Sequence, residues 1–305
     1  IIRKIRHKNY IQNIKGVRQT NAVHLFFIRS QGGIRTMITS TSNGQIKKIQ
    51  QLLKKSRTRR EEGLFVAEGI KMFREAPGDR IKKIYLKASF AEKGTWKEIL
   101  REKGLEEKGE DLAELVEDKV FNSLSDTVTP QGVLCLVRTK ECTLEEMIPE
   151  NKAPLLMVLE DLQDPGNLGT ILRTGEGAGV TGIILSKNSV DIYNPKVIRS
   201  TMGSVYRMPF YYTSSIREEI LPWFKEKKIT GYAAHLEGKN SYDQEDYTKG
   251  TAFFIGNEGN GLSRELSEKA DVWIRIPMEG QVESLNAAMA SGILMYEAFR
   301  QRRNP

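Results

Sequence analysis

Histidine and cysteine are scarce in this sequence, and their scarcity excludes several common kinds of enzyme. Only three histidines occur in 305 residues, and His235 is the only one after residue 36. A Ser-His-Asp or Cys-His catalytic system would have to use His235, and no Gly-x-Ser-x-Gly segment carries a nucleophilic serine. The two cysteines, Cys135 and Cys142, have no second pair with which to build a disulfide framework or a zinc site. We therefore expect no metal, and a reducing cytoplasmic setting of bacterial type.

The sequence also lacks long apolar runs and phosphate-binding loops. No stretch approaches the ~20 consecutive apolar residues of a transmembrane helix, so we expect no membrane segment. No Gly-x-x-x-x-Gly-Lys-Ser/Thr segment is present, which argues against a P-loop NTPase. Residues 177–182 do match Gly-x-Gly-x-x-Gly, but they follow a predicted helix and precede a predicted strand, the reverse of the dinucleotide-binding order. We interpret them as a helix-to-strand turn.

Positive charge is concentrated at the beginning of the chain. The formal net charge is +8, and residues 1–36 contain eight lysines and arginines and no acidic residue, whereas the remainder holds 39 basic and 39 acidic residues. Residues 1–36 show no clear periodicity, and Met37 opens a stretch that resembles a protein start. We expect residues 1–36 to be non-native upstream sequence or a disordered basic extension. A basic RNA-binding arm is one alternative, and an organellar transit peptide, which would imply an organellar location, is another.

Residues 37–140 alternate short helices and strands, which predicts a small α/β domain. Residues 44–60 predict one helix with an apolar side formed by isoleucines and leucines. Between Lys47 and Arg60 this helix carries seven basic residues and no acid, a run that could neutralise RNA phosphates. A solvated helix face is the alternative. The side chains assigned to RNA binding are Lys54, Lys55, Arg57, Arg59 and Arg60.

Residues 141–153 are polar and contain Pro149, which predicts a linker to a second domain at 154–305. In that domain predicted strands alternate with predicted helices, so we expect a mostly parallel sheet covered on both faces. The predicted strands are 155–159, 182–185, 230–235, 252–255 and 272–276. The predicted helices are 168–177, 195–202, 216–227, 263–270 and 285–302. Ligands of such sheets bind at the carboxyl ends of the strands, so the loops that follow strands are the candidate site.

Three loops meet this description. In the first, Asn167 is placed to cap a helix, and Arg173 lies six residues further on, where a guanidinium near a helix start suits a phosphate or carboxylate. In the second, Glu258 stands within Gly-Asn-Glu-Gly-Asn-Gly, whose glycines permit a close approach of backbone to a ligand. In the third, Ser284 is a plausible N-cap of a last helix rich in small residues. Ordinary capping, a hairpin-like turn and tight helix packing are the respective alternatives.

Taken in order, these segments resemble the SpoU/TrmH family of the SPOUT methyltransferases. The resemblance covers residues 153–303 and rests on segments 164–174, 256–262, 276–278 and 284–286. Residues 65–69 and 130–133 are similar to the substrate-binding domain attached to many members of that family, which itself resembles a ribosomal RNA-binding protein.

The resemblance implies a trefoil-knotted α/β domain in which the chain after Ile276 passes through a loop. It implies S-adenosyl-L-methionine as the cofactor, bound near Ala234, Gly256, Ile276 and Leu285. It also implies a homodimer formed through this domain.

The resemblance further implies methylation of a ribose 2'-hydroxyl of RNA. This hydroxyl must lose a proton as it attacks the methyl group, and the residue that matches Arg173 is assigned to activating it. Because the pKa of a free arginine is above ~12, we favour a role for Arg173 in holding a phosphate and stabilising the developing alkoxide over a role as base. Asn167, Glu258, Ser284 and Asn286 would orient the ribose, Arg173 and the surrounding loops.

The extra N-terminal domain favours ribosomal RNA, of the 23S type, over transfer RNA as the substrate. Two other classes remain as alternatives: a non-catalytic RNA-binding protein of the same fold, and a methyltransferase directed at a base. Methylation that confers antibiotic resistance is a further possibility within the ribosomal class.

Overall fold

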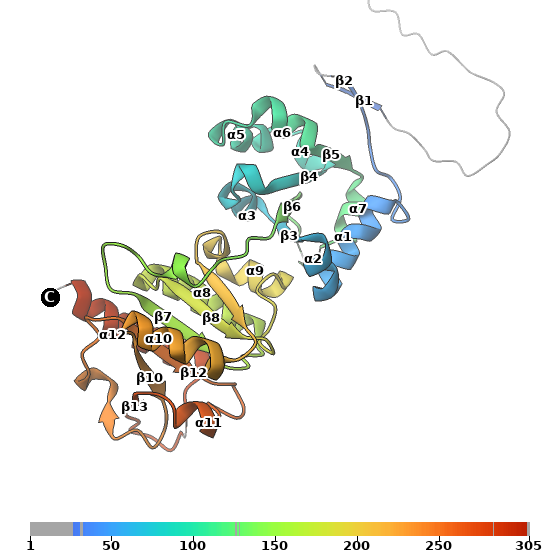
Figure 1. Cartoon of the computed structure of the whole chain (residues 1–305). Coiled ribbons are helices and arrows are strands. Elements are labelled where there is room, and N and C mark those ends of the chain that lie inside the picture. Colours follow the sequence, from blue (N-terminus) through green and yellow to red (C-terminus); the bar gives the residue numbers. More distant parts are fainter. Residues whose placement is uncertain (1–26, 31–32, 126, 128, 283, 304–305) are drawn as a thin grey trace, which may run out of the picture.

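A computed structural model describes residues 27–30, 33–125, 127, 129–282 and 284–303. Two α/β units follow one another along the chain, each built around its own sheet (Figure 1). Among these described residues, no helix is both long enough and apolar enough to cross a membrane.

The N-terminal unit is built on a four-stranded sheet of order β3-β6-β4-β5, in which only the β4–β5 pair is parallel. Its strands are β3 (Leu64–Glu68), β4 (Ile81–Lys87), β5 (Ala113–Val116) and β6 (Val133–Arg138). Its helices are α1 (Gly44–Lys54), α2 (Ser56–Glu62), α3 (Ile70–Glu75), α4 (Ala88–Ala91), α5 (Thr95–Glu102), α6 (Glu106–Leu112) and α7 (Asp118–Asn122). The apolar side of α1 packs as predicted, because Ile46, Ile49 and Leu52 are fully buried.

The single helix predicted over residues 44–60 is wrong. The chain leaves helical geometry at Lys55, whose φ of −121° and ψ of 114° are extended, and a second helix, α2, begins at Ser56. The break changes the direction of the basic run, so its arginines do not share one face with the lysines of α1.

The segment before residue 37 is partly structured. Phe27–Ser30 (β1) and Gly33–Thr36 (β2) pair as an antiparallel hairpin, so a disordered extension does not describe these residues. Residues 1–26 lie outside the described part of the chain.

The C-terminal unit contains a seven-stranded sheet in which every neighbouring pair is parallel, with the order β11-β13-β10-β12-β7-β8-β9. The strands are β7 (Leu155–Leu159), β8 (Gly182–Ser186), β9 (Phe210–Thr213), β10 (Thr230–Ala234), β11 (Asn240–Ser241), β12 (Thr251–Ile255) and β13 (Val272–Arg275). The helices are α8 (Pro165–Ala178), α9 (Pro195–Thr201), a π-helical segment (Ile216–Ile220) that runs into α10 (Leu221–Lys227), α11 (Arg264–Ser267) and α12 (Ala287–Arg303). The expectation of a mostly parallel α/β sheet is confirmed.

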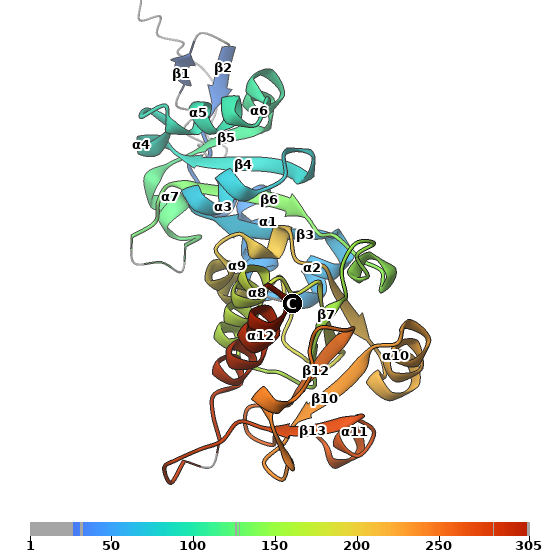
Figure 2. The same cartoon turned by 90° about the vertical axis from the view of Figure 1, so that its left-hand side faces the viewer.

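Both faces of this sheet are covered because side chains alternate along each strand. Met157 and Ile183 pack in one cluster with side chains of α8, α9 and α12, and Leu156 and Ile184 pack in another with side chains of α10 and α11. These two groups of helices lie on opposite sides of the sheet (Figure 2). The turn at residues 177–182 joins α8 to β8, as predicted from the order of helix and strand, and Gly179 supplies its left-handed residue with φ 76°.

The two units share an apolar core where α9 packs on β3. Phe65 of β3 stacks on Tyr193 with ring centroids 4.5 Å apart, and the hydroxyl of Tyr206 donates to the carbonyl of Met72 over 3.2 Å. The segment predicted as a linker joins β6 to β7, and its Met147 is fully buried against Gly182. The orientation of the two units is therefore set by packed side chains.

Candidate active site

The three loops selected from the sequence meet at one edge of the C-terminal sheet. Because all its strands are parallel, the loops that follow β7, β12 and β13 all leave from the carboxyl edge. The loop after β7 leads into α8, the loop after β12 contains Glu258, and the long segment after β13 leads to Asn286 and α12.

A chain of side-chain hydrogen bonds joins these three loops. The amide nitrogen of Asn286 donates to the amide oxygen of Asn167 over 2.9 Å, and the amide nitrogen of Asn167 donates to the Glu258 carboxylate over 2.9 Å. The same carboxylate accepts the backbone N–H groups of Gln163 and Asp164 over 3.0 and 2.9 Å. Three predicted site residues, separated by up to 119 positions in sequence, are thus in one network.

The environment of Glu258 keeps it ionised. Burial disfavours its charged form, but hydrogen bonds from the Gln163 backbone, the Asn167 side chain and the Asp164 backbone outweigh burial and lower its pKa from 4.5. An ionised Glu258 can only accept hydrogen bonds, which fixes the Asn167 amide with its oxygen toward Asn286.

Two expected helix caps are corrected by the structure. Asp164, rather than Asn167, is the N-cap of α8, and its carboxylate accepts the N–H of Asn167 over 2.7 Å. At α12 the side-chain oxygen of Asn286, rather than Ser284, accepts the N–H groups of Ala288 and Met289 over 2.9 and 3.3 Å. Ser284 is exposed and makes no hydrogen bond to another described residue. In both cases a neighbouring polar residue that also favours N-caps took the position.

Arg173 does not join this network. It lies on α8 six residues after Asn167, and the helical repeat places it on the exposed side of α8 while Asn167 is buried. Among the described residues we find no ion pair or hydrogen bond to its guanidinium. Its donors are therefore available to a ligand at the surface.

Three of the four residues expected at a cofactor lie at the ends of neighbouring strands, and the fourth lies just before α12. Ala234 ends β10 and pairs in register with Ile274, Gly256 follows β12, and Ile276 follows β13. Ala234 and Ile276 are half-buried against the core, and Leu285 directly precedes the anchored Asn286. An apolar, half-buried rim at the carboxyl edge fits a purine ring, so the residues are compatible with the cofactor's adenosine.

Gly256 is required by a close approach of the chain to itself. A Cβ on Gly256 would lie 2.0 Å from the carbonyl carbon of Gly261 and 2.1 Å from the nitrogen of Leu262. Asn257 and Gly261 exchange two backbone hydrogen bonds that close this loop, and Gly261 has a φ of 67°. Glycine is needed here for a close approach, as expected, but the group that approaches Gly256 is the protein's own backbone and not a ligand.

The basic run contains one residue that cannot contact RNA. Arg59 is 4% exposed, and its guanidinium binds the Asp191 carboxylate over 2.6 Å and the Leu52 carbonyl over 2.6 Å. The prediction that Arg59 binds RNA is wrong. The helix breaks at Lys55, and the Arg59 side chain then points toward Asp191 and forms an ion pair between the two units. The other assigned cations are exposed: Lys54, Lys55, Arg57 and Arg60.

Sequence reasoning missed the residues that hold the first two loops together. Asn257 donates from its side chain to the carbonyl of Asp161 over 2.8 Å and accepts the N–H groups of Gly259 and Asn260. Asp161 itself has a φ of 51°, which is uncommon for a residue with a side chain. Both residues lie two positions after the end of a strand, β12 and β7, and this position in the sequence could have indicated them.

Comparison with known proteins identifies the two units. The model of the MRM3-like substrate binding domain matches residues 43–135, and that of the SpoU rRNA Methylase family matches residues 154–296. An uncharacterized tRNA/rRNA methyltransferase of Synechocystis is 34% identical over 269 residues, which are 87% of this chain and 94% of that protein. The chain belongs to the SpoU rRNA methylase family. Within this family of RNA methyltransferases, the 23S rRNA (guanosine(2553)-2'-O)-methyltransferase RlmP of Bacillus subtilis is 31% identical over 60% of this chain and 70% of its own length.

Solved structures of the SpoU family extend the likeness over both units. The AdoMet-bound rRNA methyltransferase from Sinorhizobium meliloti has a TM-score of 0.72 and 30% identity, covering 87% of this chain and 97% of its own. The SpoU methyltransferase AviRb from Streptomyces viridochromogenes, in complex with AdoMet, has a TM-score of 0.75 and 26% identity, covering 86% of this chain and 99% of its own.

Proposed function

We propose that this protein transfers the methyl group of S-adenosylmethionine to a ribose 2'-hydroxyl of ribosomal RNA, of the 23S type. The observation that carries the proposal is the Asn286–Asn167–Glu258 network, which ties the three carboxyl-edge loops into one rigid site. Two of the similar solved structures contain AdoMet, and the name of one relative specifies 2'-O-methylation of 23S rRNA; both support the proposal.

The chemistry follows from the residues at the edge. Ala234, Gly256, Ile276 and Leu285 would hold the cofactor, which would supply an electrophilic methyl group for transfer to the 2'-oxygen. The hydroxyl proton leaves to solvent. Arg173 holds the neighbouring phosphate and stabilises negative charge on the attacking oxygen, because a guanidinium is permanently charged and offers a fork of donors. The hydrogen bonds among Asn167, Asn286 and Glu258 hold the start of α8 at the edge of the sheet where the cofactor would bind. The rate acceleration would then come from the positioning of the substrate.

The proposal includes the knot and the homodimer. The knot rests on the family likeness alone, because the close approach of Gly256 to the Gly261–Leu262 backbone is a turn within one loop. Met289 and Tyr296 are 61% and 50% exposed and lie seven residues apart on one side of α12, next to α8. A second copy of the chain on this apolar strip would cover it and bring the partner's surface near Arg173.

The test is methyl transfer from labelled S-adenosylmethionine to total RNA and to undermodified ribosomal particles, using the full chain, followed by nucleoside analysis. Labelled 2'-O-methylribose in ribosomal RNA is the expected result. Label on a base would replace the ribose assignment with a base-directed methyltransferase. Absence of label in every RNA, with cofactor binding intact by calorimetry, would favour a non-catalytic RNA-binding protein.

Arg173→Ala separates catalysis from binding. It should abolish transfer and leave cofactor affinity within about 2-fold, because the side chain is exposed and makes no hydrogen bond or ion pair with another described residue. Arg199, on the neighbouring helix α9, provides a comparison arginine: Arg199→Ala should retain transfer. Loss of cofactor binding in Arg173→Ala would show that its role is structural.

A further inference from the structure

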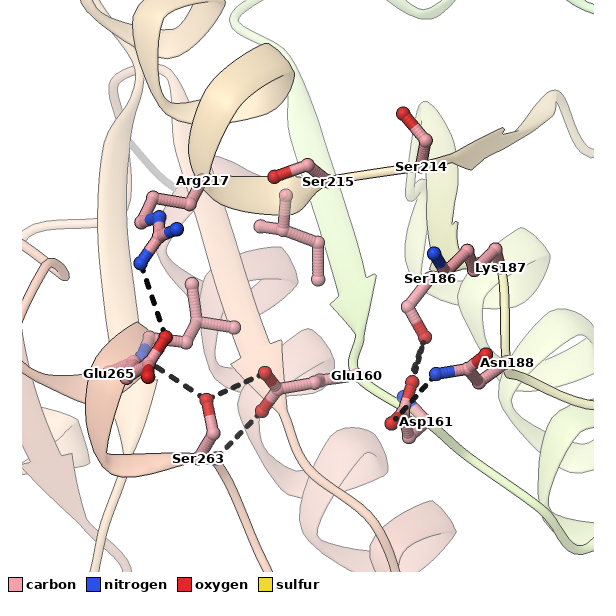
Figure 3. Close-up of a pocket in the computed structure, with 12 residues that line it drawn as sticks. Glu160, Asp161, Ser186, Lys187, Asn188, Ser214, Ser215, Arg217, Ser263 and Glu265 are labelled. Atoms are coloured by element: carbon pink, nitrogen blue, oxygen red, sulfur yellow. Dashed lines mark hydrogen bonds and ion pairs between the residues drawn. The ribbon is translucent and has the colours of Figure 1, made fainter.

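A cavity lies beside the candidate active site, at the carboxyl ends of β7, β8 and β9 (Figure 3). Its volume is about 240 Å³, and it is open to solvent. The loop after β7 separates it from the hydrogen-bonded network: Asp161 lines the cavity, whereas the backbone of Gln163 and Asp164, two and three residues later, binds Glu258. None of the catalytic or cofactor residues named above lines it.

Two carboxylates held in fixed orientations form one side of the cavity. Glu160 accepts both the hydroxyl and the backbone N–H of Ser263, each over 2.7 Å. Asp161 accepts the hydroxyl of Ser186 over 2.6 Å, and its own N–H donates to that hydroxyl over 2.8 Å. Asn188 also donates its side-chain N–H to the second Asp161 oxygen over 3.4 Å, so each of the four carboxylate oxygens accepts one hydrogen bond and keeps one lone pair. The interior therefore repels a phosphate and favours a ligand edge that carries N–H donors.

The remaining lining provides an apolar face and one available cation. Ile216 and Leu266, both buried, contribute the apolar part. Arg217 is occupied by Glu218 and Glu265 over 3.0 and 3.2 Å. Lys187 is exposed at the rim, and we find no ion pair between its ammonium and another described residue. A ligand with a flat ring, N–H donors along one edge of the ring and a phosphate beyond the opposite edge matches this arrangement.

The turn that carries Lys187 contacts the loop after β7 on one side and Arg59 of α2 on the other. The carbonyl of Asn188 accepts from the Gln163 side chain over 2.8 Å, and the N–H of Val190 donates to the Leu162 carbonyl over 2.8 Å. At the other end of the turn, Asp191 binds Arg59 of α2, whose neighbours in sequence include the exposed cations of the basic run. The turn therefore lies between α2, which carries exposed cations, and the loop after β7, which leads into the candidate active site.

We propose that this cavity binds a guanine base of the substrate RNA that flanks the methylated nucleotide. The Glu160 and Asp161 carboxylates accept the guanine N1–H and N2–H groups, and Lys187 binds the phosphate of the same nucleotide. Uracil offers one N–H between two carbonyl oxygens, which the carboxylates repel, and adenine and cytosine each offer a single amino group. The base is a neighbour rather than the target's own because the loop after β7 stands between the cavity and the Asn167–Glu258 contact. The inference rests on the proposed methylation of RNA.

The test substitutes inosine, which lacks the N2 amino group, for each guanine near the methylated nucleotide in a ribosomal RNA fragment. In the native protein one flanking position should lose affinity by about 10- to 100-fold, the usual penalty for a lost bidentate base contact. In Glu160→Gln that same substitution should cost less than 3-fold, because the amide places an N–H donor where one of the carboxylate acceptors of the guanine edge stood. Glu268→Gln changes an exposed carboxylate that directly follows α11 and does not line the cavity; it is the matched control and should keep the full penalty.

Lys187→Ala provides a second variant, in which an exposed side chain without an ion pair to another described residue is removed. It should weaken binding to all fragments alike and lower the slope of log affinity against log salt by about 1, whereas Lys269→Ala should change neither. Binding, rather than methyl transfer, is the readout, so the cavity is tested even if the methylation assay fails. Equal inosine penalties in the native protein and Glu160→Gln, or no penalty at any position, would overturn the proposal.

Discussion

Replacing Arg59 with Ala tests whether a buried ion pair holds the two units together. The guanidinium is 4% exposed and the Asp191 carboxylate 21% exposed, with a closest contact of 2.6 Å. Removing one partner of a buried pair leaves an uncompensated charge and typically costs about 3–5 kcal/mol. Because Asp191 keeps some contact with water and still accepts the N–H of Tyr193 over 3.0 Å, we expect about 3 kcal/mol for Arg59→Ala.

Arg57 is the matched control, since it belongs to the same basic run and helix. Its side chain is 83% exposed and pairs only with Glu61, four residues on, so Arg57→Ala should cost about 0.3–0.5 kcal/mol. The double variant Arg59→Ala/Asp191→Ala should be more stable than Arg59→Ala alone, because no unpaired buried carboxylate remains.

Urea denaturation provides the assay, with circular dichroism for the whole chain. Tryptophan fluorescence adds a probe in each unit, because Trp96 lies in the N-terminal unit and Trp223 and Trp273 in the C-terminal unit. In Arg59→Ala the two units should separate into two transitions at lower urea. If Arg59→Ala proves as stable as Arg57→Ala, the contact between the units does not depend on this ion pair.

Three further predictions concern the site and the RNA surface. Gly256→Ala should cost about 1–3 kcal/mol through overpacking and abolish cofactor binding by calorimetry, because its Cβ would lie 2.0 Å from the Gly261 backbone; Gly259→Ala, whose nearest neighbour is 3.5 Å away, should do neither. The folded-state pKa of Glu258 is lowered from 4.5, so the stability it adds is present above pH 4.5 and lost as pH falls through the lowered value; the difference in unfolding free energy between the native protein and Glu258→Gln should shrink in acid, and a constant difference would contradict this. Changing the exposed basic residues Lys54, Lys55, Arg57 and Arg60 to Ala should weaken RNA binding and flatten its salt dependence, while lowering the unfolding free energy by less than about 1 kcal/mol. Unchanged affinity would identify a solvated face.

Patterns that depend on neighbours in sequence predicted much of the fold. The alternation of apolar runs and helices predicted a parallel sheet, because buried parallel strands need apolar residues on both faces. The short strands β9 and β11 were missed, since Phe210–Thr213 follows a helical segment without a clear alternation and Asn240–Ser241 is only two residues long. The cap at Asp164 was missed because the neighbouring polar residues of that loop are equally good capping types.

Contacts between distant parts of the chain were not predictable in the same way. Nothing in the run from Lys47 to Arg60 distinguishes Arg59 from Arg57, because both are arginines in an acid-free segment; only the extended backbone at Lys55 and the approach of Asp191 decide which one is buried. The carboxylate pair of Glu160 and Asp161 likewise becomes a cavity wall only when β8 and β9 lie beside β7.

The sequence by itself determined the alternation of elements, the edge of the sheet where the loops gather and the family motifs, because these depend on periodicity and on residue types at short spacing. The tertiary structure alone decided the partners: that Asn286 reaches Asn167, that Glu258 accepts the N–H groups at the end of the loop after β7, and that Arg59 joins the two units. The physical reason is that a hydrogen bond or ion pair acts over about 3 Å, whereas its partners here stand 91 to 132 residues apart, so only the folded backbone brings them within range.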